Sequence, residues 1–76
     1  MRKIQHEIVK EIAVLSQNSG GYTKEINLIA WNGNEPKIDI RSFSPNREKC
    51  GKGVTLTADE ATALLKALQE ELNNGD

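Results

Sequence analysis

The chain has 76 residues, of which 28% are charged, and its formal net charge is -1. A chain of this length forms one small domain that buries roughly 60% of the surface exposed by its unfolded form. A single cysteine, Cys50, and a single histidine, His6, exclude an intrachain disulfide and a metal cage of the Cys/His kind. Small domains otherwise gain stability by self-association, so we expect a homodimer.

The net charge hides two oppositely charged parts of the chain. Residues 1–57 carry nine Lys/Arg against six Asp/Glu, a net charge of +3, whereas residues 58–76 carry one lysine against five carboxylates, a net charge of -4. A basic region of this kind can attract polyanions. No apolar run approaches the roughly 20 residues of a membrane-spanning helix, and the N-terminus lacks the pattern of a secretory signal. We therefore expect a cytoplasmic protein.

Alternation predicts two strands in the first part of the chain. Residues 4–15 suit either a helix or a strand that starts at Ile8; the β-branched content and the following turn favour the strand. Ser16–Gly21 is predicted to be a loop whose two glycines supply positive φ angles. From Tyr22 to Trp31, even-numbered residues share one face and odd-numbered residues form the other, more polar face.

Two further strands follow a turn at Asn32-Gly33, a strong hairpin signal. The strand Lys37–Phe43 is predicted to bury Ile38 and Ile40 and to turn its odd-numbered residues to solvent or a ligand. A polar loop over Ser44–Gly51 leads to a short last strand over Lys52–Leu56, in which a glycine at position 53 permits close backbone approach.

The C-terminal part is predicted to be an amphipathic helix. Thr57-Ala58-Asp59-Glu60 has the pattern of a capping box at its start. Its apolar stripe consists of Ala61, Leu64, Leu65, Leu68 and Leu72. Residues 1–76 are therefore expected to form a single α+β domain, a four-stranded antiparallel meander sheet followed by a C-terminal helix packed on it.

The residues offer no convincing catalytic or metal-binding set. His6 lies in a polar context and is expected to be an ordinary surface residue, and a lone loop cysteine such as Cys50 is usually a bystander. Asp39 and Arg41, two apart on one strand face, are expected to form an ion pair. Gly51-Lys52-Gly53 matches no phosphate-binding loop, although Arg47, Lys49 and Lys52 make a basic loop that could hold a polyanion. We expect no enzymatic activity, no cofactor and no metal.

A set of basic side chains interleaved with aromatic rings favours single-stranded nucleic acid as the ligand. Rings stack on bases and Lys and Arg follow the phosphate charge, whatever the base sequence. The alternative is that Trp31 and Phe43 fill the core, and strand register decides between the two. The candidate ligand-binding residues are Tyr22, Lys24, Trp31, Lys37, Arg41, Phe43, Lys49 and Lys52.

Two motifs carry a family resemblance. Asp39-Ile40-Arg41 followed by an aromatic at position 43, and then Gly51-Lys52-Gly53-Val54-Thr55-Leu56 before a helix, resemble the C-terminal domain of the eukaryotic transcriptional positive cofactor four. The whole chain is similar to the small bacterial YdbC-type members of that family. The resemblance implies a homodimer that binds single-stranded DNA with little sequence preference, and it implies that the first segment is a strand. Trp31 aligns with an aromatic of the family's strand-turn region, and Lys52 aligns with the lysine of its Gly-Lys-Gly-like segment.

The chain departs from the family where Ser44-Pro45 replaces a tryptophan, so that one stacking platform is absent or is supplied by Tyr22 or Phe43. We predict a non-enzymatic binder of single-stranded DNA, with RNA as a further ligand, that acts in transcription, replication or repair. The acidic helix is expected to pack away from the ligand. The alternatives are a dimeric protein–protein adaptor without a nucleic-acid ligand and, third, an enzyme that uses Cys50.

Overall fold

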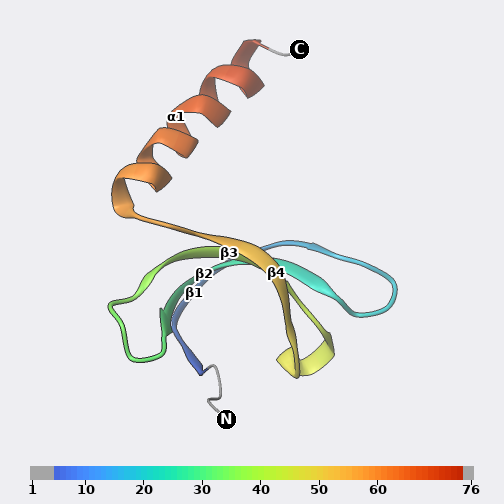
Figure 1. Ribbon diagram of the computed structural model, residues 1–76. Coiled ribbons are helices and arrows are strands. Elements are labelled where there is room, and N and C mark those ends of the chain that lie inside the picture. Colours follow the sequence, from blue (N-terminus) through green and yellow to red (C-terminus); the bar gives the residue numbers. More distant parts are fainter. Residues whose placement is uncertain (1–4, 75–76) are drawn as a thin grey trace.

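The computed structural model describes residues 5–74, which form a four-stranded antiparallel sheet followed by one helix (Figure 1). The strands lie in the order β1-β2-β3-β4, as a meander requires. This arrangement confirms the predicted α+β fold and the assignment of the first segment as a strand. The elements are β1 (His6–Gln17), β2 (Thr23–Trp31), β3 (Lys37–Phe43), a 3-10 turn η1 (Pro45–Arg47), β4 (Cys50–Leu56) and α1 (Ala58–Asn74).

The element ends differ slightly from the predicted ones. β1 continues to Gln17, and β4 already begins at Cys50 instead of Lys52. In the first loop Gly21 has a positive φ of 87°, but Gly20 does not, so only one of the two glycines supplies the predicted left-handed conformation. Residue 4, the first of the predicted first segment, lies outside the described residues.

The sheet is strongly curled, and its concave side faces away from α1 (Figure 1). The pairing of β1 with β2 shifts register at three places, and the pairing of β3 with β4 shifts once. Such bulges bend a strand and increase its twist. As a result Arg47, just after β3, donates to Glu11 on β1 over 2.9 Å, although β1 and β3 are not neighbours in the sheet.

The concave side holds the buried residues of the sheet. Ile29 and Phe43 are 0% and 1% exposed, and the polar residues Glu25, Asn27 and Asp39 are buried beside them. The expectation that the odd-numbered face of β3 meets solvent is therefore wrong for Asp39 and Phe43. The curl closes this face, and hydrogen bonds to the buried polar side chains compensate for their loss of contact with water.

The convex side is apolar and faces the start of α1. A groove of about 210 Å³ is lined by Ile26, Ile38, Ile40, Leu56, Ala61, Leu64, Leu65 and Leu68. No residue of α1 is buried, and the helix projects away from the sheet beyond its first turns (Figure 1). The helix therefore packs on the sheet less closely than the sequence predicts.

Two local structures, a helix cap and a tight turn, form as the sequence predicts. Thr57 N–H donates to Glu60 Oε1 over 2.9 Å and Glu60 N–H donates to Thr57 Oγ1 over 3.1 Å, which completes the capping box. Asn32 and Gly33 have φ angles of 52° and 79°, and Asn34 N–H donates to the carbonyl of Trp31 over 2.9 Å. Positive φ at both central residues is what a type I′ turn needs.

Candidate nucleic-acid interface

The buried Asp39 carboxylate on β3 joins three strands of the concave side. Its Oδ2 accepts a hydrogen bond from Trp31 Nε1 on β2 over 3.2 Å and from Thr55 Oγ1 on β4 over 2.9 Å. Arg41 Nε donates to Oδ1 over 2.6 Å and Arg41 Nη2 donates to Oδ2 over 3.0 Å. The carboxylate is thus fully engaged, and it fixes the positions of the Trp31 and Arg41 side chains.

Arg41 lies over the ring of Trp31, with its guanidinium carbon 4.6 Å from the ring centroid. Arg41 Nη1 also donates to the carbonyl of Gly51 over 2.9 Å. The hydrogen bonds to Asp39 raise the pKa of Arg41, burial opposes them, and the attraction to the carboxylate adds to the rise. The predicted ion pair is therefore present, and it holds a charged guanidinium, 14% exposed, against a half-buried indole.

A second buried carboxylate, Glu25 on β2, engages the loop after β3. It accepts hydrogen bonds from Thr23 Oγ1 over 2.6 Å, from Asn27 Nδ2 over 3.1 Å and from Arg47 Nη2 over 3.0 Å. Burial raises the pKa of Glu25, but these hydrogen bonds and the charge of Arg47 outweigh it and leave the pKa below its ordinary value. Arg47 also pairs with Glu11, so it is not the unpaired cation of a basic loop that the sequence suggests.

Three rings meet on the concave side because the sheet curls. The imidazole of His6 lies 5.1 Å from the ring of Trp31 and 6.4 Å from the ring of Phe43, measured between centroids. The guanidinium carbon of Arg47 lies 5.9 Å from the Phe43 centroid. Phe43 is covered and presents no free face to a base in this structure, so its stacking role stays a prediction. His6 is exposed, as the sequence predicts, but its ring also lies beside two others, and nothing in its local sequence indicates this contact.

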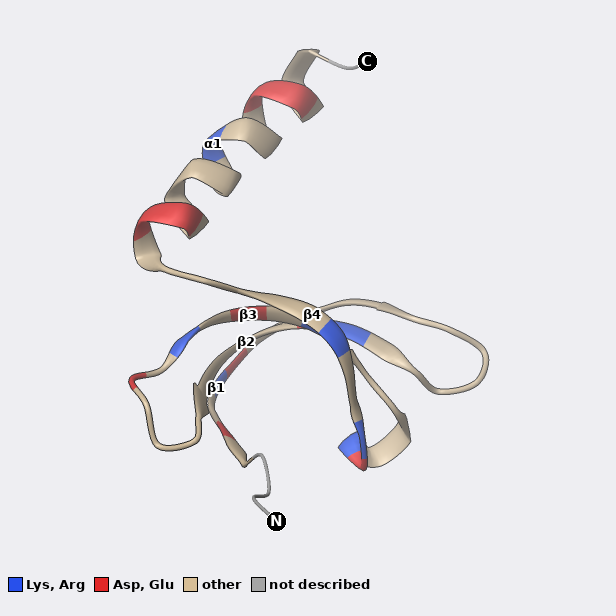
Figure 2. Cartoon of the chain, in the orientation of Figure 1, with Lys and Arg blue, Asp and Glu red and all other residues tan. Residues whose placement is uncertain are grey.

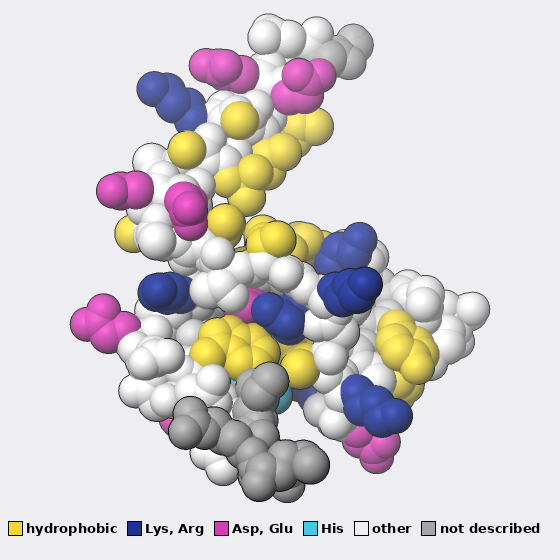
Figure 3. Space-filling view, in the orientation of Figure 1, with side chains coloured by type: hydrophobic (Ala, Val, Ile, Leu, Met, Phe, Trp, Pro, Cys, Tyr) yellow, Lys and Arg dark blue, Asp and Glu magenta, His cyan; other side chains and the backbone are white. Residues whose placement is uncertain are grey.

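Four of the predicted lysines are exposed and make no ion pair within residues 5–74: Lys24, Lys37, Lys49 and Lys52. Figure 2 places basic residues along the strands, whereas the helix carries mainly acidic ones. In the space-filling view, Lys and Arg side chains gather over the sheet and Asp and Glu side chains over α1 (Figure 3). The predicted separation of charge therefore exists in space, and the lysines are its accessible cations.

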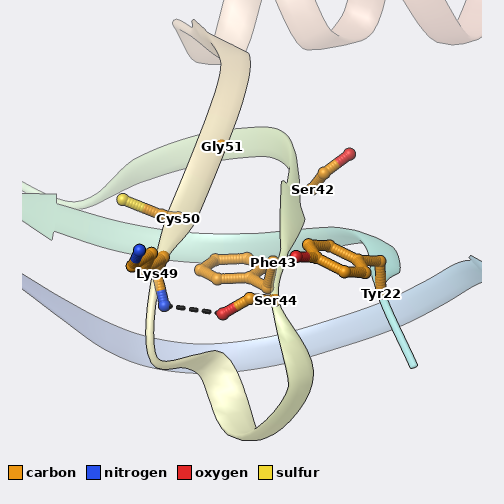
Figure 4. Close-up of a pocket in the computed structure, with 7 residues that line it drawn as sticks. All are labelled: Tyr22, Ser42, Phe43, Ser44, Lys49, Cys50 and Gly51. Atoms are coloured by element: carbon orange, nitrogen blue, oxygen red, sulfur yellow. Dashed lines mark hydrogen bonds between the residues drawn. The ribbon is translucent and has the colours of Figure 1, made fainter. Parts of the chain in front are cut away.

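The eight predicted residues do not form a single cluster. Trp31, Arg41 and Lys37 share the odd-numbered face of β2 and β3, with the indole at the C-terminal end of β2. Lys24 falls on the opposite face of β2 by alternation. At the other end of β2, a hollow of about 330 Å³ is lined by Tyr22, Ser42, Phe43, Ser44, Lys49, Cys50 and Gly51 (Figure 4).

Across residues 5–74 no group of three or more His, Cys, Asp or Glu side chains could hold a metal ion. Within the same range no helix has the length and apolar character to cross a membrane.

Comparison with known proteins places the chain in a family. The sequence profile of the transcriptional coactivator p15 (PC4) matches residues 19–67. The chain belongs to the PC4 family. A chain from Treponema pallidum (strain Nichols), named only as an uncharacterized protein, is 44% identical over 59 residues, which are 78% of this chain and 69% of the other. The PC4 match spans the loop before β2, strands β2 to β4 and the first half of α1, and PC4 domains are non-enzymatic DNA-binding domains.

Proposed function

We propose that the protein binds single-stranded DNA with little sequence preference and acts in transcription, with RNA as a second ligand. The observation that carries the proposal is the Trp31 ring, held by Asp39 and covered by Arg41, in a member of the PC4 family. Every base has a π-face, so stacking on an indole or a guanidinium tolerates any sequence. We place this activity in the cytoplasm.

Charge neutralisation in this proposal comes from the exposed lysines. The guanidinium groups of Arg41 and Arg47 are already paired with carboxylates, so each adds little net charge to the concave side. Lys24, Lys37, Lys49 and Lys52 are exposed and make no ion pair with another described residue, so they are available to phosphates. The rings and Arg41 then position the bases, while the lysines supply the salt-dependent part of the affinity.

We also propose that two copies of the chain associate through the apolar side of α1. Leu64, Leu65, Leu68 and Leu72 are all among the exposed large hydrophobic side chains, and the groove beneath them is equally apolar. A second copy would cover this surface and leave the concave side free. Leu65→Asp should convert the dimer to a monomer in sedimentation experiments. Lys66→Asp, at the adjacent position, is the control and should leave the dimer intact.

The stacking role of Trp31 is tested by replacing it. Trp31→Ala should weaken binding of a fluorescent dT15 oligonucleotide by about 5- to 150-fold, which corresponds to ~1–3 kcal/mol for one stacked base. Trp31→Phe keeps a ring and should lose less. The thermal unfolding of both variants should stay cooperative. Unchanged dT15 affinity in a folded Trp31→Ala protein would contradict the proposal.

A further inference from the structure

The hollow at the Tyr22 end of the sheet is built from two fixed loops. In the first loop, Asn18 Oδ1 accepts from the Tyr22 N–H over 3.0 Å, and the Tyr22 carbonyl accepts from the Asn18 N–H over 2.9 Å. In the second loop, Ser44 Oγ accepts from the Lys49 N–H over 2.8 Å, and the Ser44 N–H donates to the Lys49 carbonyl over 2.9 Å. Both walls are therefore held in place before any ligand arrives.

The chemistry of the walls fits a nucleotide. Tyr22 is 52% exposed, so its ring has a face available for stacking. Lys49 on the other wall is exposed and makes no ion pair among the described residues, so its ammonium group can meet a phosphate. Figure 4 shows the ring of Tyr22, the Ser44 hydroxyl and Lys49 around the same space. The volume of about 330 Å³ lies at the lower end of the range for ligand pockets.

The position of the hollow relative to Trp31 implies a path for the ligand. Tyr22 immediately precedes β2, and Trp31 is its last residue. The curl of the sheet brings the two places together, because Phe43, which lines the hollow, and Trp31 both lie beside His6, at 6.4 Å and 5.1 Å between ring centroids. A strand of nucleic acid that touched both Tyr22 and Trp31 would thus cross the concave side by a short path.

We propose that this hollow is a second nucleotide subsite of the interface. A base stacks on the Tyr22 ring, and the Lys49 ammonium contacts the adjoining phosphate. The proposal rests on the proposed function, and it places a stacking ring close to Ser44 in the hollow.

Cys50 allows occupancy of the hollow to be measured directly. It is the only cysteine of the chain, it is exposed, and it lines the hollow. The rate of its alkylation by iodoacetamide, an uncharged probe, should fall at least fivefold when dT15 is bound at saturation. Tyr22→Ala should weaken dT15 binding by about 5- to 150-fold and reduce the protection of Cys50, whereas Tyr22→Phe should preserve both.

The outcomes separate this proposal from the general one. If dT15 binds in a Trp31-dependent manner but neither slows Cys50 alkylation nor responds to Tyr22→Ala, the subsite is overturned and the proposed function stands. If dT15 does not bind at all, both are overturned. Lys49→Ala should weaken dT15 binding. Lys66→Ala on α1, which also removes one lysine, is the control and should weaken dT15 binding less than Lys49→Ala does.

Discussion

At the scale of residues, two buried carboxylates organise the concave side. Asp39 accepts four hydrogen bonds and Glu25 is likewise engaged, each by an arginine that also lies over an aromatic ring. Among the described residues no buried side-chain nitrogen or oxygen lacks a partner. Breaking a buried pair is costly because the remaining charge stays without compensation. These carboxylates should therefore matter more for stability and ring placement than for net charge.

Asp39→Asn should lower the free energy of unfolding by roughly 3 kcal/mol, at the low end for a broken buried pair because Arg41 keeps some contact with water. It should also loosen Trp31, whose indole N–H loses its charged acceptor. Trp31 is the only tryptophan, so steady-state fluorescence anisotropy reports on it without interference. Exposed Glu35→Gln is the control. An unfolding free energy within 0.5 kcal/mol of the parent, the usual range for surface changes, would contradict this role.

The lowered pKa of Glu25 predicts a loss of stability in acid. Since the folded protein holds this carboxylate below the value of about 4.3 expected in the unfolded chain, its stabilisation is complete above that pH and is lost as the pH falls through the folded value. Urea unfolding between pH 7 and pH 3 should show this loss in the parent and less of it in Glu25→Gln. Equal pH dependence in the two proteins would remove Glu25 as the cause.

At the scale of elements, local patterns were good predictors of what each segment forms. The capping box, the Asn-Gly turn and the alternation of β2 and β3 all appear as expected. Alternation also assigned the two faces correctly. It could not indicate which face is buried, because that depends on register shifts in β1 and on the curl that they produce. The sequence pattern contains no residue that marks those shifts.

Gly53 on β4 is required by close backbone packing. A Cβ at this position would collide with the Cβ of Arg41 and the carbonyl oxygen of Ile40. Gly53→Ala should therefore displace β4 from β3, lower the melting temperature and weaken the hydrogen bond from Arg41 to Gly51. Gly33→Ala is a useful comparison, because its Cβ meets no atom and its cost comes only from a positive φ of 79°. An unchanged melting temperature for Gly53→Ala would contradict the packing argument.

At the scale of the whole molecule, the charge separation seen in the sequence is also present in the folded chain, but arginines and lysines have different roles in it. Arg41 and Arg47 serve the internal structure of the concave side, and Lys24, Lys37, Lys49 and Lys52 are exposed around the sheet. The contact of His6 with Trp31 and Phe43 could not be predicted. His6 starts β1, and Trp31 and Phe43 are the last residues of the antiparallel strands β2 and β3, so they lie at opposite ends of this strand pair. Only the closure of the curled sheet brings them together.

The affinity for dT15, measured beside a duplex of the same length over a series of salt concentrations, tests the central claim most directly. Single strands should bind more tightly than duplex, because only unpaired bases can stack on Trp31. The logarithm of the binding constant should fall linearly with the logarithm of salt concentration, with a slope of up to about -3 per protomer if Lys24, Lys37, Lys49 and Lys52 each neutralise one phosphate. Absent binding, equal affinity for duplex, or an affinity independent of salt would contradict the account.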